Sequence, residues 1–291
     1  MARLTTTVTI EHGFIKVLVA KRQQVVAHRV LMASPQFFRE GLVRDTKRIG
    51  AMVQAAFEEM EVAPGQAIGA VPGFQTSLRL LELPKARGFD PAVVIPREAS
   101  RLMGVSQQTS LLTWHRLPSG EDRTRWLVLS AARRAVHAYV ETMKDAGLRV
   151  NTLEMRPFAL ARAVNQPDAI IAWVAPDGCE VVVVRESVPV MQQSLFWGAE
   201  PVEGLVLVYR LTEIIERTIT AHDAENPQGP LSGEAAVYVC GSPISLDETV
   251  GPQVSESLQR PVGTLTPPMT YDGDFPVNDF VVNIGLTLRE A

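Results

Sequence analysis

The chain has little of what would place it outside the cell, in a membrane or on nucleic acid. Its 291 residues include only two cysteines, Cys179 and Cys240, which are too few for a disulfide framework and form no C-x-x-C pair. This sparse use fits a reducing cytosol. No uninterrupted apolar run approaches the roughly 20 residues of a membrane-spanning helix, so we expect no direct membrane insertion. The formal net charge of −4 argues against binding to nucleic acid.

Common catalytic motifs are missing as well. The sequence contains no P-loop, no G-x-G-x-x-G, no H-E-x-x-H and no G-x-S-x-G pattern. Its five histidines are scattered without the local spacing of metal ligands. Asp272, Asp274 and Asp279 are close in sequence, but the prolines around them favour a solvated surface connection. These residues therefore indicate no catalytic site and no metal site.

What the sequence does contain is an alternation of strand and helix patterns. At 46% hydrophobic and 21% charged residues, the chain is typical of a globular protein with a sizeable core. The first part predicts three strands within residues 4–30, a helix that begins at Asp45 or Thr46, and a strand at 66–72. A smaller α/β block follows, with strands at 76–83, 110–117 and 126–130 and a helix near 96–103.

The central residues 126–164 join this first part to the second. A helix after the strand at 126–130 carries Val136, Tyr139, Val140 and Met143 on one face. Gly147 suits a helix C-cap because glycine tolerates the left-handed region. A strand at 148–153 and a helix at 158–164 complete the unit.

The second half predicts another strand meander followed by a helix and a strand. The predicted strands lie at 169–174, 180–185, 189–195 and 235–240, and the long helix lies around 207–219. Ser245 and Glu248 have the spacing of a capping box that opens a further helix. A last strand at 262–265 and a helix at 279–288 are also predicted. Meander, helix and strand thus occur in both halves, as a weak structural repeat.

The central unit has an order of features that points to a family. The strand end Ser130-Ala131-Ala132 precedes Arg133, the helix ends in Ala146-Gly147-Leu148, and residues 154–162 read EMRPFALAR. This ordered set resembles the PilM family of actin-like proteins, cytoplasmic components of type IV pilus assembly that are related in fold to the cell-division protein FtsA. The alternative is an unrelated α/β domain that shares a strand–helix–strand unit with a glycine cap.

The resemblance implies an α/β fold of the actin-like (ribonuclease-H-like) kind, with two lobes and an inserted small α/β subdomain. It predicts a first ribonuclease-H-like half at residues 1–74, the inserted subdomain at 75–151 and a second half at 152–291. Between Trp197 and the helix that holds Glu213 there are too few residues for the helical subdomain that covers the nucleotide in the family. We therefore predict that this subdomain is missing.

Actin-type ATPases cradle phosphates with the backbone N–H groups of two hairpin turns, where glycine permits close approach. The family's first hairpin reads Asp-Ile-Gly, small residues and then Val-Lys. Here Thr9 stands for the aspartate, Glu11 for the glycine and Phe14 for a serine. Lys16 is kept and is a candidate nucleotide ligand, whereas Glu11 would put negative charge where phosphate should lie.

The other two nucleotide loops are also altered. In the second hairpin, Asp177-Gly178 favours an ordinary turn over a phosphate loop. The third loop keeps Gly241 before Pro243, and Gly241 is either a turn glycine or a second candidate nucleotide contact. The ATPase motifs are thus degraded, and no cofactor is expected, although ATP with Mg²⁺ is the ligand that Lys16 and Gly241 would contact.

Together with the degraded loops, the resemblance to the PilM family implies a non-catalytic scaffold of type IV pilus assembly, or of a related secretion system. The resemblance implies a PilN-like inner-membrane partner whose short cytoplasmic tail binds beside the inserted subdomain, with the strand at 76–83 as the expected region. Other proteins of the assembly platform are further expected partners, and the expected location is the cytoplasm, peripheral to the inner membrane. An alternative is a PilM-like switch that binds or hydrolyses ATP, and a third hypothesis is a degenerate domain of a type II secretion platform.

Overall fold

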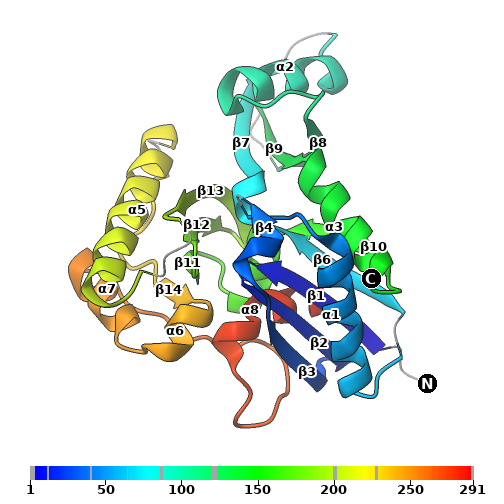
Figure 1. The fold of residues 1–291 in the computed structure, drawn as a ribbon. Coiled ribbons are helices and arrows are strands. Elements are labelled where there is room, and N and C mark those ends of the chain that lie inside the picture. The colour runs from blue at the N-terminus through cyan, green and yellow to red at the C-terminus, as the bar shows by residue number, and fades with distance from the viewer. Residues whose placement is uncertain are drawn as a thin grey trace.

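The computed structural model contains two β-sheets with helices on both faces of each (Figure 1). It describes residues 4–11, 13–39, 41–63, 65–85, 88–118, 123–198, 202–226 and 229–289. One sheet has five strands in the order β10-β6-β1-β2-β3, and the other has seven in the order β14-β11-β12-β13-β7-β9-β8. A short two-stranded ribbon, β4 (Phe38–Arg39) and β5 (Leu42–Val43), follows a 3₁₀ turn at Pro35–Phe37.

The first sheet grows from an antiparallel meander of β1 (Leu4–Glu11), β2 (Phe14–Lys21) and β3 (Gln24–Met32). Helix α1 (Thr46–Glu59) begins where the Asp45 carboxylate accepts a hydrogen bond from the backbone N–H of Arg48, as the predicted cap requires. The chain then returns as β6 (Gln66–Val71), parallel to β1. Strand β10 (Arg149–Met155) adds to β6, also in parallel.

The second sheet repeats this pattern. Strands β11 (Ala169–Ala175), β12 (Gly178–Arg185) and β13 (Val188–Phe196) form an antiparallel meander, with Asp177 in the turn between the first two. Helix α5 (Gly204–Glu225) then leads to β14 (Val237–Cys240), which is parallel to β11. Two halves with the same meander, helix and parallel strand confirm the predicted ribonuclease-H-like repeat.

Two helices lie between the sheets and form the centre of the molecule. These are α4 (Arg156–Val164) and the last helix, α8 (Val277–Thr287), which contact each other and share one apolar cluster with both sheets. Gly285 allows the close crossing, because a methyl group there would overlap the backbone of Ala159. The Asn283 side chain of α8 donates hydrogen bonds to the carbonyl oxygens of Thr7 and Lys16, at 3.3 and 3.2 Å.

The inserted subdomain projects from the body, with its helix at the tip (Figure 1). It contains β7 (Thr76–Pro84), α2 (Pro91–Met103), β8 (Ser110–Leu117) and β9 (Arg123–Ala132). Its three strands extend the second sheet, since β7 pairs with β9 on one side and with β13 on the other. The insertion lies in the first half of the sequence but joins the sheet of the second half.

Helix α3 (Arg133–Asp145) and β10 pack with the first sheet. The hydroxyl of Tyr139 donates a 2.7 Å hydrogen bond to the carbonyl oxygen of Val8, and Gly69 leaves room for the tyrosine ring. Met143 belongs to the same apolar cluster as α1. Gly147 ends the helix with a φ of +72°, as predicted. Residues 133–151, grouped by the prediction with the inserted subdomain, contact both parts: α3 packs on α1 of the first half, and Arg133 donates hydrogen bonds to the carbonyl oxygens of Gln107 and Thr109 in the insertion.

Three local predictions were wrong. The helix predicted near 96–103 begins earlier, because Asp90 caps it and Pro91 occupies its first turn. The helix predicted to open at Ser245 is replaced by two short ones: α6 (Ser242–Leu246) begins earlier, and α7 (Val250–Leu258) begins at a turn in which Asp247 accepts hydrogen bonds from Thr249. The strand predicted at 262–265 is a single bridge from Val262 to Val237.

Candidate functional site

The first hairpin, between β1 and β2, is occupied by an ion pair of its own. The Lys16 ammonium donates to the Glu11 carboxylate at 2.8 Å, and the two side chains are 0% and 2% exposed. The hairpin register places Lys16 opposite Thr9, two residues before Glu11, so the two charges are diagonal neighbours on one face. Lys16 therefore has a buried protein partner in place of free access to a ligand.

A second buried ion pair bridges the two sheets. Arg156, at the start of α4, donates from Nη1 to the Glu180 carboxylate of β12 at 3.1 Å. The guanidinium lies 3.6 Å from the ring centre of Trp173 on β11, which is a cation–π contact. A methyl group on Gly73 would overlap the same carboxylate, so glycine is needed there for the pair to fit. Burial raises the pKa of Glu180, and the charge of Arg156 opposes that rise.

Gly241 lies beside the two ion pairs, whose charges all act on the neighbouring Cys240; this buried region between the lobes is called the cleft. Its φ of +114° lies in a region that side chains rarely adopt, and a Cβ atom would overlap the Val174 backbone of β11. Its glycine identity is thus explained by close packing of β14 against β11. Next to it, burial raises the pKa of the Cys240 thiol to about 12, while the charges of Lys16 and Arg156 act to lower it. The structure therefore brings Lys16 and Gly241 to one place, with Arg156 and Glu180 between the lobes.

These residues do not fit a nucleotide bound in the manner of an actin-type ATPase. Such a site needs backbone N–H groups open to the phosphates and cations free to contact them. Here the Glu11 carboxylate already occupies Lys16, and Glu180 occupies Arg156. Only residues 197–203 connect β13 to α5, too short a segment for a helical subdomain over the cleft. Among the described residues, no group of three or more His, Cys, Asp or Glu could hold a metal ion.

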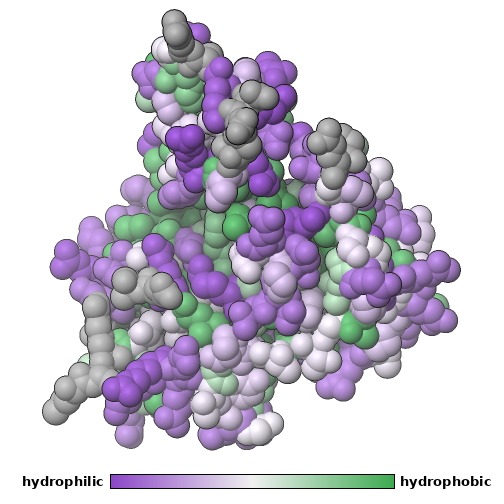
Figure 2. Space-filling model, turned by 180° about the vertical axis from the view of Figure 1, so that it is seen from behind, coloured by the Kyte–Doolittle hydropathy of each residue, from purple (hydrophilic) through white to green (hydrophobic). Residues whose placement is uncertain are grey.

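A second candidate site lies where the inserted subdomain meets the first sheet. It is a groove of about 540 Å³ between strands β8 and β9 on one side and β10, α3 and α4 on the other. Seen from behind, hydrophobic side chains gather in a hollow at the base of the projection (Figure 2). The apolar residues that line the groove are Val71, Leu111, Leu112, Leu129, Val136, Leu153, Met155 and Phe158.

One wall of the groove is an edge strand. Strand β8 pairs with β9 alone, so its outer backbone groups have no neighbouring strand in the described part of the sheet. Leu111 of β8 lines the groove and is 39% exposed. The charged residues of the groove are Glu154 and Arg289, and Glu154 is already paired with Arg162. The groove is therefore open and predominantly apolar.

The strand at 76–83, expected to receive a partner tail, does not line this groove. As β7, it lies inside the second sheet and is flanked by β9 and β13. Helix α2 covers one of its faces through Leu81, Ile95 and Ala99. The apolar surface beside the inserted subdomain is provided by β8 and β9 instead.

Arg156 and Glu180 were not among the predicted site residues, although the sequence contains a signal for a buried ion pair. Glu180 is the single charge in the strand GCEVVVV, and Lys16 is the single charge in FIKVLVA. Charged side chains are almost never fully buried without a partner, so an isolated charge in an apolar strand predicts an ion pair. The identity of the partner was not predictable, because Arg156 is 24 residues away from Glu180.

Comparison with known proteins gives similarity in structure only. No protein-family model matches the sequence, and no curated protein matches it either. The fold is similar to a solved PilM–PilN type IV pilus biogenesis complex, with a TM-score of 0.73 and 18% identity over 99% of this chain and 98% of that one.

Two further solved structures are similar over nearly the whole chain. The cytoplasmic domain of EpsL, an inner-membrane component of the type II secretion system of Vibrio cholerae, has a TM-score of 0.53 and 12% identity, covering 99% of this chain and 97% of that one. A Bacteroides thetaiotaomicron protein with an actin-like ATPase fold has a TM-score of 0.51 and 10% identity, with the same coverage. Together with the repeated half-sheets, these likenesses show that the chain has the actin-like fold.

Proposed function

We propose that this protein is a non-catalytic actin-fold scaffold in the assembly of type IV pili or of a related secretion system. Its groove would bind the short cytoplasmic tail of a PilN-like inner-membrane protein. The observation that carries the proposal is the open apolar groove beside edge strand β8, in a fold similar over its whole length to the PilM–PilN complex. Such a groove gains free energy when an apolar peptide covers it.

The membrane association in this proposal depends on the partner. Among the residues that the structure describes, no helix combines the length and the apolar character needed to span a bilayer. A tail bound in the groove would hold the protein at the cytoplasmic side of the inner membrane, next to other proteins of the assembly platform. The two buried ion pairs, Lys16–Glu11 and Arg156–Glu180, support a structural role for these residues and not a role in binding and hydrolysing nucleotide.

The experiment is a binding titration with a synthetic peptide of the N-terminal cytoplasmic tail of the PilN-like protein from the same cell. Val136→Asp places a charge on the α3 wall of the groove, and we expect at least tenfold weaker binding. Burying an unpaired carboxylate against an apolar ligand costs well over the roughly 1.4 kcal/mol that a tenfold change requires. Deleting residues 75–151 would be a poorer test, because it removes core residues Tyr139 and Met143.

Val140→Asp is the matched control. Val140 lies one turn further along α3, is exposed, and does not line the groove. It should leave the affinity unchanged, and both variants should keep the wild-type circular dichroism spectrum. Equal affinities for wild type and Val136→Asp would reject the groove as the tail site, and undetectable binding by wild type would reject the PilN-like partner.

A further inference from the structure

The seven-stranded sheet is splayed where the inserted subdomain joins the second half. In the described part of the chain, the only registered pair between β13 and β7 is Met191 opposite Arg79. Strand β7 continues to Pro84 beside β9, and β13 begins at Val188 beside β12. Alternate backbone N–H and C=O groups of a strand point toward each neighbour, so both strands direct polar groups into the gap between them.

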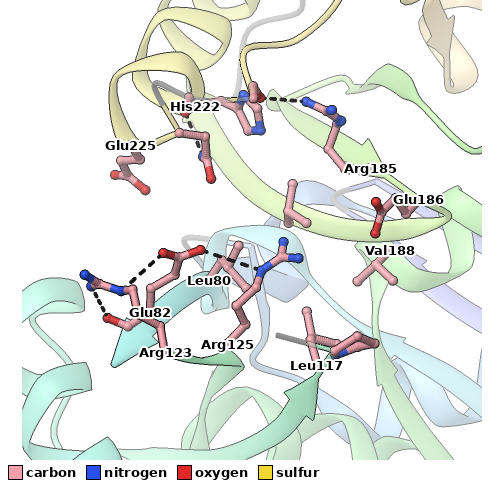
Figure 3. A pocket seen from close by; sticks show the side chains of 14 residues that line it. Leu80, Glu82, Leu117, Arg123, Arg125, Arg185, Glu186, Val188, His222 and Glu225 are labelled. Carbon is pink, nitrogen blue, oxygen red and sulfur yellow. Dashed lines mark hydrogen bonds and ion pairs between the residues drawn. The ribbon is translucent and has the colours of Figure 1, made fainter. Parts of the chain in front are cut away.

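Cavities occupy this gap. One of about 540 Å³ and one of about 340 Å³ share lining residues from both walls, namely Leu80, Glu82, Arg123, Val190, Glu225 and Asn226. Figure 3 shows the larger one: Arg125 and Leu80 face it from β9 and β7, and Val188, Arg185 and His222 face it from β13, β12 and α5. None of its residues lines the apolar groove, so the two sites are separate.

The charges of the larger cavity leave one arginine incompletely paired. The Glu82 carboxylate serves two guanidinium groups, with its oxygens 3.5 Å from Arg123 Nε and 3.7 Å from Arg125 Nε. The second distance exceeds a hydrogen bond, and the buried Nε of Arg125 has no hydrogen-bond partner among the residues that the structure describes. By contrast, Arg185 is bound to Asp168 and to the Gly229 and Pro230 carbonyl oxygens.

The opposite wall does not neutralise this arginine. Glu225 is paired with Arg79, and Glu186 lies at the exposed rim beside Val188 (Figure 3). A single additional carboxylate beside Arg125 would therefore complete the pairing on the β7–β9 wall. Arginine and carboxylate can form two parallel hydrogen bonds, which gives such a contact direction as well as charge.

We infer that the gap between β7 and β13 is a second docking site, for an extended peptide segment of a partner protein that carries an acidic side chain. The segment adds a strand between the two diverging edges and satisfies backbone groups on both sides. Its acidic side chain pairs with Arg125, and its neighbouring side chains contact Leu80, Val188 and Val190. The site joins the inserted subdomain to the second lobe, so its occupant fixes the angle between them.

The test uses the full chain and a phage-displayed library of random ten-residue peptides. Selected peptides should contain Asp or Glu among β-branched residues. Their synthetic forms should bind Arg125→Leu at least tenfold more weakly than wild type, and Arg125→Lys should restore part of the loss. Replacing the peptide's acidic residue by its amide should weaken binding to wild type but not weaken it further for Arg125→Leu, as a double-mutant cycle requires.

Arg97→Leu is the control, because Arg97 is an exposed arginine of the same subdomain that lines neither cavity. Peptides that keep their affinity for Arg125→Leu, or that lose it equally with Arg97→Leu, would overturn the inference. So would a library that yields no binder. A dimer in sedimentation velocity that Arg125→Leu dissociates would assign the gap to a second copy of the chain and reject a partner peptide.

Discussion

The cleft between the lobes and the groove beneath the inserted subdomain are neighbours in the chain but opposite in character. Met155 and Phe158 line the groove, whereas Arg156, between them, reaches into the cleft. The cleft contains two ion pairs whose side chains are at most 5% exposed. The groove contains open apolar surface and the outer edge of β8, beside which the described residues place no further strand. Residues 155–158 thus contribute both to the cleft, which ion pairs fill, and to the open groove.

The two regions differ in what a ligand would have to displace. A ligand in the cleft would have to break ion pairs that were desolvated during folding, and separating a buried pair leaves an uncompensated charge. A ligand in the groove would cover apolar surface that is already exposed to water. The charged residues of the cleft are thus part of the buried interior, while the exposed apolar surface lies beside the insertion.

The largest effect is expected from breaking the buried pair in the first hairpin. Lys16→Met leaves the Glu11 carboxylate buried without its partner and should lower the free energy of unfolding by about 3–5 kcal/mol. Urea denaturation followed by circular dichroism measures the change. The double variant Lys16→Met/Glu11→Gln should recover most of the loss, because it removes both charges. Arg101→Met, which breaks the exposed Arg101–Glu98 pair, should cost less than about 1 kcal/mol.

A smaller decrease in the free energy of unfolding is expected when a methyl group is added in the cleft. Gly73→Ala would place a methyl group against the Glu180 carboxylate, which Arg156 and Trp173 hold in place. Overpacking of this kind typically costs about 1–3 kcal/mol. The same urea titration checks it, and Gly65→Ala is the control because a methyl group there meets no other atom within 4 Å. A fully stable Gly73→Ala protein would show that the cleft has free space.

In the groove, truncating an exposed side chain should lower the affinity for the partner tail more than it lowers the free energy of unfolding. Leu111 is 39% exposed, so Leu111→Ala should alter the free energy of unfolding by no more than about 0.5 kcal/mol. Its affinity for the partner-tail peptide should nevertheless fall several-fold, since apolar contact area is lost. Unfolding and fluorescence anisotropy on the same preparation separate the two effects. Loss of stability without loss of affinity would reverse the distinction between groove and cleft.

The local parts of this architecture were predictable from the sequence, and the long-range parts were not. Three features depend on residues that are close in the sequence, and all three are present: the first meander, the Asp45 cap of α1 and the Gly147 end of α3. The strand expected at 262–265 is reduced to one bridge, in which the backbone N–H of Val237 donates to Pro261 and that of Gly263 donates to Val237. The hydrophobic periodicity of a segment does not show how many residues of a neighbouring strand it can pair with.

The sites depend on pairings across the chain. The second sheet takes in β7, β8 and β9 through the contact of β13 with β7, which no local pattern indicates. The groove needs residues of β6, β8, β9, α3, β10 and α4, so its lining residues could not be chosen in advance. For the cleft, the altered residues Glu11 and Phe14 predicted a changed loop, but the bridge from Arg156 to Glu180 required the tertiary structure.

The smallest expected effect is the response to nucleotide, and it decides whether the cleft is closed. A ligand present at about 100 times its dissociation constant adds roughly 2.7 kcal/mol to the stability of the folded state. For a chain of this size, each kcal/mol raises the melting temperature by about 2–4 °C. We expect no shift in a thermal melt with saturating Mg·ATP, because Lys16 and Arg156 are already bound to carboxylates. A rise of several degrees that Lys16→Met abolished would show that nucleotide can displace Glu11, and the ATP-dependent switch would then become the better account of the cleft.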